Sequence, residues 1–290
     1  FCNKIWNAGR FLLLNLEDQK PVSKEEINKL QEGDQLDLGE RWILSRLQKV
    51  ISETNDNLEK FRFHEASNEL YHFFWHEFCD WFVELAKMNF TGEDPDKKSK
   101  TCQVAIYILE ENLRLLHPFI PFITEELWQQ LPHSGDSLMV AAYPVVHPEW
   151  MDSEAEEEME GFQELVASIR TSRSENNIDP RSKIFVQLAC EQKSRNFLES
   201  QCEQIKSLAH LSQIDLVPHL EAEGRRVQGV SKLAEFSLIL DEVIDVEADR
   251  RRLIQQIGRS EDNVRHLQKQ LDNSDFVNKA PEQVVAATRE

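Results

Sequence analysis

The chain has 290 residues, of which 40% are hydrophobic, enough for one large or two modest domains with real cores. Asp and Glu number 52 against 33 Lys and Arg, a formal charge of -19, which argues against indiscriminate binding of polyanions by the whole surface. The sequence has neither a run of about 18 apolar residues nor a signal-peptide pattern, so we expect a cytoplasmic protein without a membrane partner.

Residues 1 to about 131 have helical apolar spacing, which predicts a bundle of four or five helices. We expect breaks at 20–39, 91–98 and 117–122, where glycines, prolines and polar residues gather. In the first helix Ile5, Leu12 and Leu16 face inward. A later stripe places Leu44, Leu47, Ile51 and Leu58 on one side of a helix.

The helix predicted over about 63–88 is apolar nearly all round, as is typical of the buried centre of a bundle. Its polar strip consists of Glu69, His72, His76, Asp80 and Glu84. Two histidines four residues apart can bind a metal, but the sequence has no HExxH order and no third ligand at a recognised spacing. We interpret the strip as a solvated face, and leave the role of the two histidines open.

From about residue 132 the chain is irregular, with a short extended piece predicted at 138–143. An acidic run at 153–160 begins a helix to about residue 174, and we interpret this run as a solvated helix cap. Strands are predicted at 184–189, 214–217, 226–230 and 236–240, with a helix at 193–209. The pattern indicates a small α+β domain beside the bundle.

The last segment has coiled-coil spacing of apolar residues, carried by Leu253, Ile257, Val264, Leu267 and Leu271. A break at 272–275 and the helix opener Pro281 suggest an antiparallel helical hairpin that is truncated at Glu290. Phe1 lies directly inside an apparent helix, so we interpret both ends as edges of a longer chain. The predicted fold is mainly α, with domains at 1–150, 151–244 and 245–290.

No catalytic constellation emerges from the sequence. There is no phosphate-binding glycine loop and no GxSxG elbow, and the chain has only 9 glycines. The cysteines are scattered without the spacing of a zinc or redox pair, and we read them as reduced thiols: Cys2, Cys79, Cys102, Cys190 and Cys202. We therefore predict no catalytic residue and no metal site in these 290 residues.

Two segments have the composition of nucleic-acid surfaces. On the first helix Asn3, Asn7 and Arg10 recur at steps of four and three, flanked by Lys4 and Phe11. Amides and guanidinium groups bind base edges, and aromatic rings stack on bases. The alternatives are that Trp6 and Phe11 are core residues and that Asn7 is a cap.

The second segment is the coiled-coil helix, where cations outnumber acids: Arg250, Arg251, Arg252, Arg259, Arg265 and Lys269. A basic helix in an acidic chain is suited to phosphates. The alternative, a solvated coiled-coil face with ion pairs, has equal standing on the residues alone.

Several segments of the sequence resemble the valyl-tRNA synthetase family, in that family's order. They are FCNKIWNAGRF at 1–11, RWILSRL at 41–47, FHEASNELYHFFWHEFCDWFVELAK at 63–87, LRLLHPFIPFITEELWQQL at 113–131, IRTSRSENNIDP at 169–180, and IDVEADRRRL with LDNSDFVNKAPEQVV between 244 and 285. HPFIPFITEELW is shared with leucyl and isoleucyl relatives, whereas FCDW and FVNKAPEQVV are more specific to the valyl branch.

The resemblance implies an anticodon-binding bundle at 1–150, a linker helix and small domain at 151–244, and an incomplete tRNA-binding arm at 245–290. It implies that Arg10 and Phe11 contact the anticodon of tRNA(Val), and that the arm lies against the outer corner of the tRNA. We add Asn3 and Asn7 as anticodon-binding candidates because they share the acid-free face with Arg10. The family is usually monomeric. Its ATP-binding and editing regions precede the segment matched here, so we expect ATP and Mg to bind elsewhere in the parent enzyme and no cofactor within this chain.

Two other functions stay open at this point. An isoleucyl or leucyl synthetase shares the more general motifs, although the zinc-ligand cysteines of the isoleucyl C-terminus are missing here. The chain could also be a free-standing helical interaction protein that uses its acidic surface and coiled coil. Specific binding to an anticodon stem-loop would distinguish an RNA-binding chain from such a protein.

Overall fold

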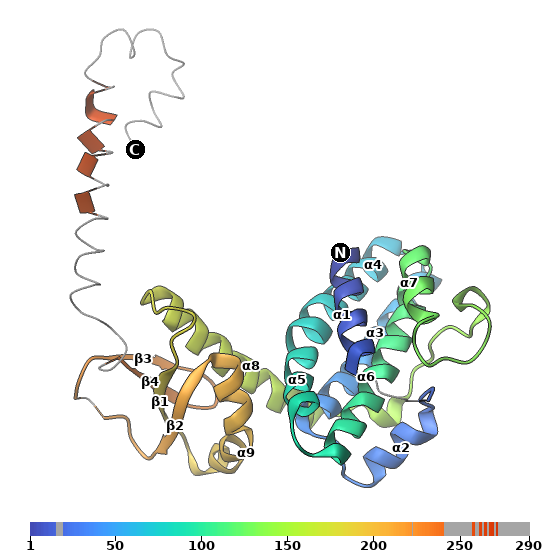
Figure 1. Ribbon diagram of the computed structural model, residues 1–290, viewed down its shortest axis with the longest axis horizontal. Helices are drawn as coiled ribbons and strands as arrows, with labels where there is room; N and C mark the ends of the chain where they lie inside the picture. The colour runs from blue at the N-terminus through green and yellow to red at the C-terminus, as the bar shows by residue number, and fades with distance from the viewer. Residues whose placement is uncertain are drawn as a thin grey trace.

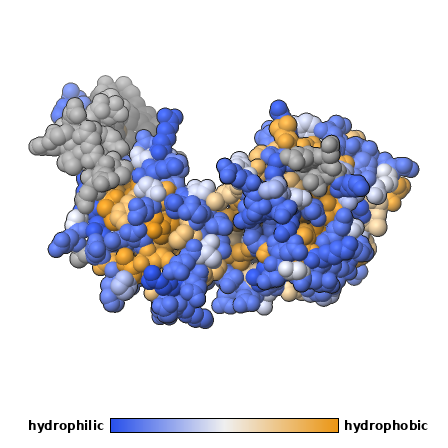
Figure 2. Space-filling view, turned by 60° about the horizontal axis from the view of Figure 1, so that its bottom comes forward, coloured by the Kyte–Doolittle hydropathy of each residue, from blue (hydrophilic) through white to orange (hydrophobic). Residues whose placement is uncertain are grey.

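The computed structural model describes residues 1–15, 20–221 and 223–240, together with 257–258, 261–262, 264–265, 267–269 and 271. Within them, helices predominate and one four-stranded sheet is present, as the predicted mainly α fold requires. Figure 1 shows a helical bundle joined by the long helix α8 to a smaller unit that holds the sheet. In Figure 2 these are two lobes with a waist between them, and hydrophilic residues cover most of the visible face of the bundle. None of the described helices is both long and apolar enough to cross a membrane.

The bundle contains more helices than the sequence predicted. Its elements are α1 (Cys2–Asn15), α2 (Lys24–Glu32), α3 (Leu38–Glu59), α4 (Phe63–His72), the π-helix η1 (Phe73–Phe82), α5 (Val83–Thr91), α6 (Pro95–Leu116), α7 (Pro121–Trp128) and the short 3₁₀ helices η2 (Leu138–Val140) and η3 (Pro148–Trp150). Two of these differ from expectation. The segment 20–39 is not one break, because it contains α2, and the piece predicted as extended at 138–143 begins with a 3₁₀ turn.

Side-chain caps explain where several helices begin. Ser23 and Glu26 form a capping box at α2, and Asp37 and Glu40 form another at α3, so two backbone N–H groups at each end are satisfied. The nine-residue α2 has two buried residues, Ile27 and Leu30. That is too few for its period to stand out in the sequence, although its capping box is a recognisable signal.

The predicted central helix is confirmed as a continuous helical run through α4, η1 and α5, but its middle is π-helical. Phe74, Phe78 and Phe82 follow one another at four-residue steps in η1, and all three are buried. The i→i+5 hydrogen bonds of a π-helix widen the turn. All three rings therefore lie on the side of η1 that faces the core.

The second unit is built on β1 (Ile184–Ala189), α9 (Gln192–Ala209), β2 (Leu211–Val217), β3 (Arg226–Val230) and β4 (Glu235–Ile239). The strand order is β2-β1-β4-β3, with β1 and β2 parallel and the other pairs antiparallel. The crossover helix α9 connects the parallel pair, as parallel strands require. The α+β prediction is confirmed, and β2 begins three residues earlier than expected.

Helix α8 (Ser153–Glu175) attaches this unit to the bundle. Arg41 Nη2 on α3 lies 2.7 Å from Asp152 Oδ2 at the start of α8, and Lys49 pairs with Glu156. Ser45 Oγ donates to Glu156 Oε1 and accepts from the backbone N–H of Asp152. The interpretation of the acidic run at 153–160 as a solvated cap is therefore wrong for Glu156, which binds α3, whereas Asp152 just before the run caps α8 and also pairs with Arg41.

Arg173 fastens the far end of α8. Its guanidinium donates to the backbone carbonyls of Ala209, His210, Asp179 and Ser182. Burial lowers the pKa of this guanidinium. The four hydrogen bonds connect α8 with the end of α9 and with the loop that leads into β1.

A buried carboxyl at the start of α3 makes stability depend on pH. Glu40 is 3% exposed; it accepts a hydrogen bond of 2.6 Å from Thr101 Oγ1, and its pKa is raised to about 7 by burial and by the nearby Asp37 carboxylate. The folded protein therefore retains this proton at a pH where the unfolded chain, with an ordinary value of 4.5, has lost it. Since the folded state then binds more protons, the free energy of unfolding falls as pH rises through this window.

We expect Glu40→Gln to remove this pH dependence, because the amide keeps the shape of the side chain and carries no titrating proton. Between pH 5 and 8 the unfolding free energy of the unsubstituted chain should fall by about 1 to 3 kcal/mol more than that of the variant. Urea unfolding at several pH values measures this difference. Parallel pH profiles for the two chains would contradict the assignment.

Candidate nucleic-acid interface

Helix α1 presents the predicted polar residues on one exposed face. Ile5 and Leu12 are completely buried, whereas Asn3, Asn7 and Arg10 are exposed. The helix contains no acidic residue. The structure thus brings together the amide and guanidinium groups that the sequence indicated, while Leu16 lies outside the described residues.

Phe11 has a mixed position beside this face. It is half-buried, with its ring centroid 5.9 Å from that of Phe90, and Lys87 Nζ lies 5.6 Å from the centroid of the Phe11 ring. Trp6 is 38% exposed. The sequence left open whether Phe11 is a core residue or part of the exposed face. The structure gives it both positions, because the ring packs against the core and also borders the exposed face of α1.

An ion pair fixes α1 against the π-helix. Lys4 Nζ lies 2.9 Å from Asp80 Oδ1 and 5.2 Å from the centroid of the Trp75 ring. The hydrogen bond to Asp80 raises the pKa of Lys4, which keeps the amine charged. This ion pair could not be predicted from the sequence, because Lys4 and Asp80 are 76 positions apart and no local pattern connects them.

The start of α1 is also held by aromatic contacts. The Phe1 ring centroid is 5.1 Å from that of Tyr71 and 6.0 Å from that of Phe74. Further along α1, a Cβ added at Gly9 would meet Leu127 of α7 at 2.9 Å, so a glycine permits close packing of α1 on α7. The exposed face of α1 is therefore carried on a helix that is held on two sides.

The histidines of the polar strip lie next to this ion pair. His72 and His76 have ring centroids 5.5 Å apart, and His76 Nδ1 is 3.3 Å from Asp80 Oδ2. Among the residues that the structure describes, no group of three or more His, Cys, Asp or Glu could hold a metal ion. Cys79, beside Asp80, is buried, which raises the pKa of its thiol to about 12.

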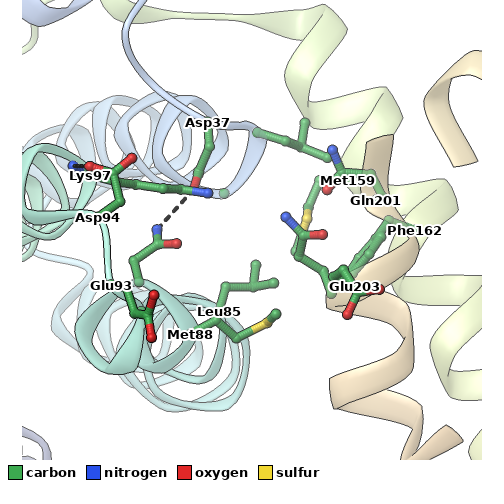
Figure 3. A pocket seen from close by; sticks show the side chains of 15 residues that line it. Asp37, Leu85, Met88, Glu93, Asp94, Lys97, Met159, Phe162, Gln201 and Glu203 are labelled. Atoms are coloured by element: carbon green, nitrogen blue, oxygen red, sulfur yellow. Dashed lines mark hydrogen bonds between the residues drawn. The ribbon is translucent and has the colours of Figure 1, made fainter. Parts of the chain in front are cut away.

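A cleft of about 230 Å³ lies between the bundle and the second unit. Figure 3 shows Leu85 and Met88 of α5 across from Phe162 of α8 and Glu203 of α9. Carboxylates outnumber the single lysine among its lining residues, which include Asp37, Glu93, Asp94, Glu203 and Lys97. This balance disfavours phosphate, so the acid-free face of α1 is the better candidate for RNA.

The basic residues of the last segment are only partly described. Arg265 and Lys269 are exposed, and Arg265 Nη1 lies 2.9 Å from Asp262 Oδ1. Ile257 and Val264, predicted for the coiled-coil seam, are 56% and 53% exposed. The other predicted contacts lie outside the described residues: Arg250, Arg251, Arg252 and Arg259. The coiled coil and the hairpin remain predictions.

Comparison with known families decides what kind of protein carries this face. The anticodon-binding domain of tRNA ligases matches residues 40–188, and the tRNA-binding arm of valyl-tRNA synthetase matches residues 245–290. The chain belongs to the valyl-tRNA synthetase family. Because the match to the arm is valyl-specific, the isoleucyl and leucyl alternatives lose their support.

Curated relatives of this family match along the whole chain. The valine–tRNA ligase of Oceanobacillus iheyensis is 38% identical over 293 residues, which covers 98% of this chain and 32% of the relative. Those of Bacillus cereus and Bacillus subtilis are 37% and 34% identical, each covering 100% of this chain and 32% of the relative. The chain thus spans about a third of the length of these synthetases, and the parts matched are the anticodon-binding domain and the arm. The match to the anticodon-binding domain begins at residue 40, after α1, whereas the relatives align with α1 as well.

The division at residues 150 and 244 stays a prediction. The match to the anticodon-binding domain continues to residue 188, into β1. Helix α8 contacts α3 of the bundle as well as α9 and β3. Because α8 packs on both the bundle and the second unit, a domain boundary on either side of α8 is hard to place from the sequence.

The different positions of Arg10 and Phe11 predict different effects on stability. Phe11→Ala removes a ring packed on Phe90 and should lower the unfolding free energy by about 1 to 3 kcal/mol. Arg10→Ala removes an exposed side chain and should change it by less than about 0.5 kcal/mol. Urea unfolding of the two variants checks this. Equal losses would mean that Arg10 supports the fold and is not free to contact a ligand.

Proposed function

We propose that this chain is the tRNA-binding portion of a valine–tRNA ligase and that α1 recognises the anticodon of tRNA(Val). The observation that carries the proposal is the exposed face of Asn3, Asn7 and Arg10 on a helix without acids, within a chain of charge -19. The complete protein would attach valine to this tRNA with ATP and Mg, which its preceding regions would bind. We also propose that it works in the cytoplasm as a monomer.

The chemistry of the α1 face suits unpaired bases. Amide side chains offer both a donor and an acceptor, so Asn3 and Asn7 can pair with base edges, and Arg10 offers a fork of donors. Phe11 borders the same face and can contribute a ring edge or part of a ring face for stacking. The anticodon is a single-stranded loop, whose bases can turn outward to meet such groups.

Rigidity supports specificity at this face. The Lys4 to Asp80 ion pair and the packing of Gly9 on Leu127 hold α1 at two points. A preorganised surface loses less conformational entropy on binding. The packing of α1 in the bundle would then fix the positions of the side chains that contact bases before RNA binds.

The arm would add affinity without reading sequence. Exposed Arg265 and Lys269 are described, and the four other arginines precede them in the same segment. Folded RNA is gripped largely through its backbone and 2′-hydroxyls, and cations neutralise phosphates. We propose that this segment contacts the body of the tRNA.

Arg10→Ala tests the α1 proposal. The variant should bind the valine anticodon stem-loop about 1 to 3 kcal/mol more weakly, and should discriminate less against stem-loops with altered anticodons. Fluorescence anisotropy with both kinds of stem-loop measures the two effects. Arg195→Ala, on α9 in the second unit, is the matched control and should bind normally. Equal weakening for every stem-loop would mean that Arg10 contacts only phosphate.

Shortening the chain after Asp245 tests the arm. For intact tRNA the slope of log affinity against log salt should become shallower by roughly 0.7 to 0.9 for each phosphate contact that is lost. Preference for the valine anticodon should persist, because α1 is retained. Titrations at several salt concentrations, with intact tRNA and with the isolated stem-loop, separate the two contributions. An unchanged slope for intact tRNA would show that the arm does not contact phosphates.

A further inference from the structure

The polar strip that runs from the end of α4 into the π-helix forms an ordered row that ends at α1. His72 and His76 have ring centroids 5.5 Å apart, inclined by 32°. His76 Nδ1 is 3.3 Å from Asp80 Oδ2, and the other oxygen of the same carboxylate accepts from Lys4 Nζ at 2.9 Å. A single carboxylate therefore separates His76 from the helix that carries Asn3, Asn7 and Arg10.

The contact with Asp80 orients the imidazole chemically. An ionised carboxylate can only accept hydrogen bonds, so the proton of the neutral ring must be on Nδ1. The second nitrogen, Nε2, is then left with a lone pair. Because 54% of the His76 side chain is exposed, that lone pair is available to an outside hydrogen-bond donor.

The four-residue spacing of the row places its members on one face of the helix. Both His76 and Asp80 lie within the π-helical run Phe73–Phe82, and π-helical turns are frequent at functional sites. The interior side of the same run carries buried Phe74 and Phe78. A buried apolar side thus supports the exposed row, and the Lys4 to Asp80 ion pair connects the row with α1.

The group complementary to the lone pair on His76 Nε2 is a hydrogen-bond donor, which a phosphate is not. Phosphate oxygens only accept hydrogen bonds, and they would also be repelled by Asp80, whose charge is already shared with Lys4. An RNA strand offers donors from its base edges and from ribose 2′-hydroxyls. The amides and guanidinium of α1 suit the bases, which leaves the sugar edge of the strand for the flank where His76 lies.

We propose that His76, positioned by Asp80, accepts a hydrogen bond from a ribose 2′-hydroxyl of the RNA strand bound across α1. This inference rests on the proposed function, since it requires the anticodon arm of a tRNA on that helix. His72 lies against the His76 ring and helps to hold its orientation. The site would let the protein sense ribose directly beside the positions where it reads bases, and so distinguish RNA from DNA at that point.

The test combines a variant with a change in the RNA. Stem-loops of the valine anticodon arm are made with a single 2′-deoxy nucleotide at each position in turn, and their affinities are measured for the unsubstituted chain and for His76→Phe. Phenylalanine keeps a ring in place and lacks the acceptor. At one position we expect the deoxy change to weaken binding to the unsubstituted chain about three- to tenfold, the size of one hydrogen bond.

The variant should bind the all-ribose stem-loop more weakly by a similar factor, and the deoxy change at that position should have no further effect on it. His76→Ala is the second variant and should behave in the same way, which guards against an effect of the phenyl ring. His219→Phe, at an exposed histidine of the second unit, is the matched control and should retain full sensitivity to the deoxy change. Circular dichroism and urea unfolding establish that each variant is folded.

The outcomes separate this inference from the proposed function. If deoxy changes weaken the variants as much as the unsubstituted chain at every position, or weaken neither, His76 does not contact a 2′-hydroxyl and the inference is overturned. If the chain binds stem-loops without regard to the anticodon sequence, the proposed recognition by α1 fails while the deoxy comparison still reports on His76. If the unsubstituted chain binds no stem-loop at all, both are overturned.

Discussion

The attachment of α8 to α3 is the main interaction that places the second unit against the bundle. Arg41 and Lys49 of α3 hold Asp152 and Glu156 at the start of α8, and Ala155 in the same turn is buried. Half-exposed ion pairs contribute little free energy individually. Their effect here is directional, because two charge partners about two turns apart on α3 fix the direction in which α8 leaves the bundle.

A second constraint is the charge of the surface. With 52 acidic residues against 33 basic ones, the chain repels polyanions over most of its area. A helix without acids, held by Lys4 and bordered by Lys87, is then an exception whose effect is larger because its surroundings are unfavourable. Binding of RNA would be confined to this face and to the basic last segment, so the acidic remainder contributes to selectivity by excluding other contacts.

Much of the fold could be predicted because its helices and strands are periodic. The spacing of apolar residues in α3, and the alternation in β1 and β3, correctly identified these elements. The short α2 escaped because two buried residues define no period. The π-helical geometry of η1 has no sequence signature of its own, since a segment that is apolar nearly all round fits either kind of helix.

The residues of the candidate site that lie on one helix could be predicted from the sequence, because their spacing along the chain places them on one face. Asn3, Asn7 and Arg10 were placed on one face by steps of four and three, and the structure shows all three exposed. Local spacing cannot reveal that Lys4 finds Asp80, or that Asp152 and Glu156 find α3, because these partners meet only through the tertiary fold. Glu156, which looked solvated in the sequence, proved to be structural for the same reason.

The length of α8 has a mechanical consequence. Its 23 residues make a rod of about 35 Å, fastened to α3 at one end and, through Arg173, to the second unit at the other (Figure 1). A rotation of about 5° at the α3 end would move the far end by about 3 Å, the length of a hydrogen bond. The side chains at the first turn of α8 therefore set the angle of this rod, and changes among them would shift the sheet relative to the bundle while leaving each unit internally intact.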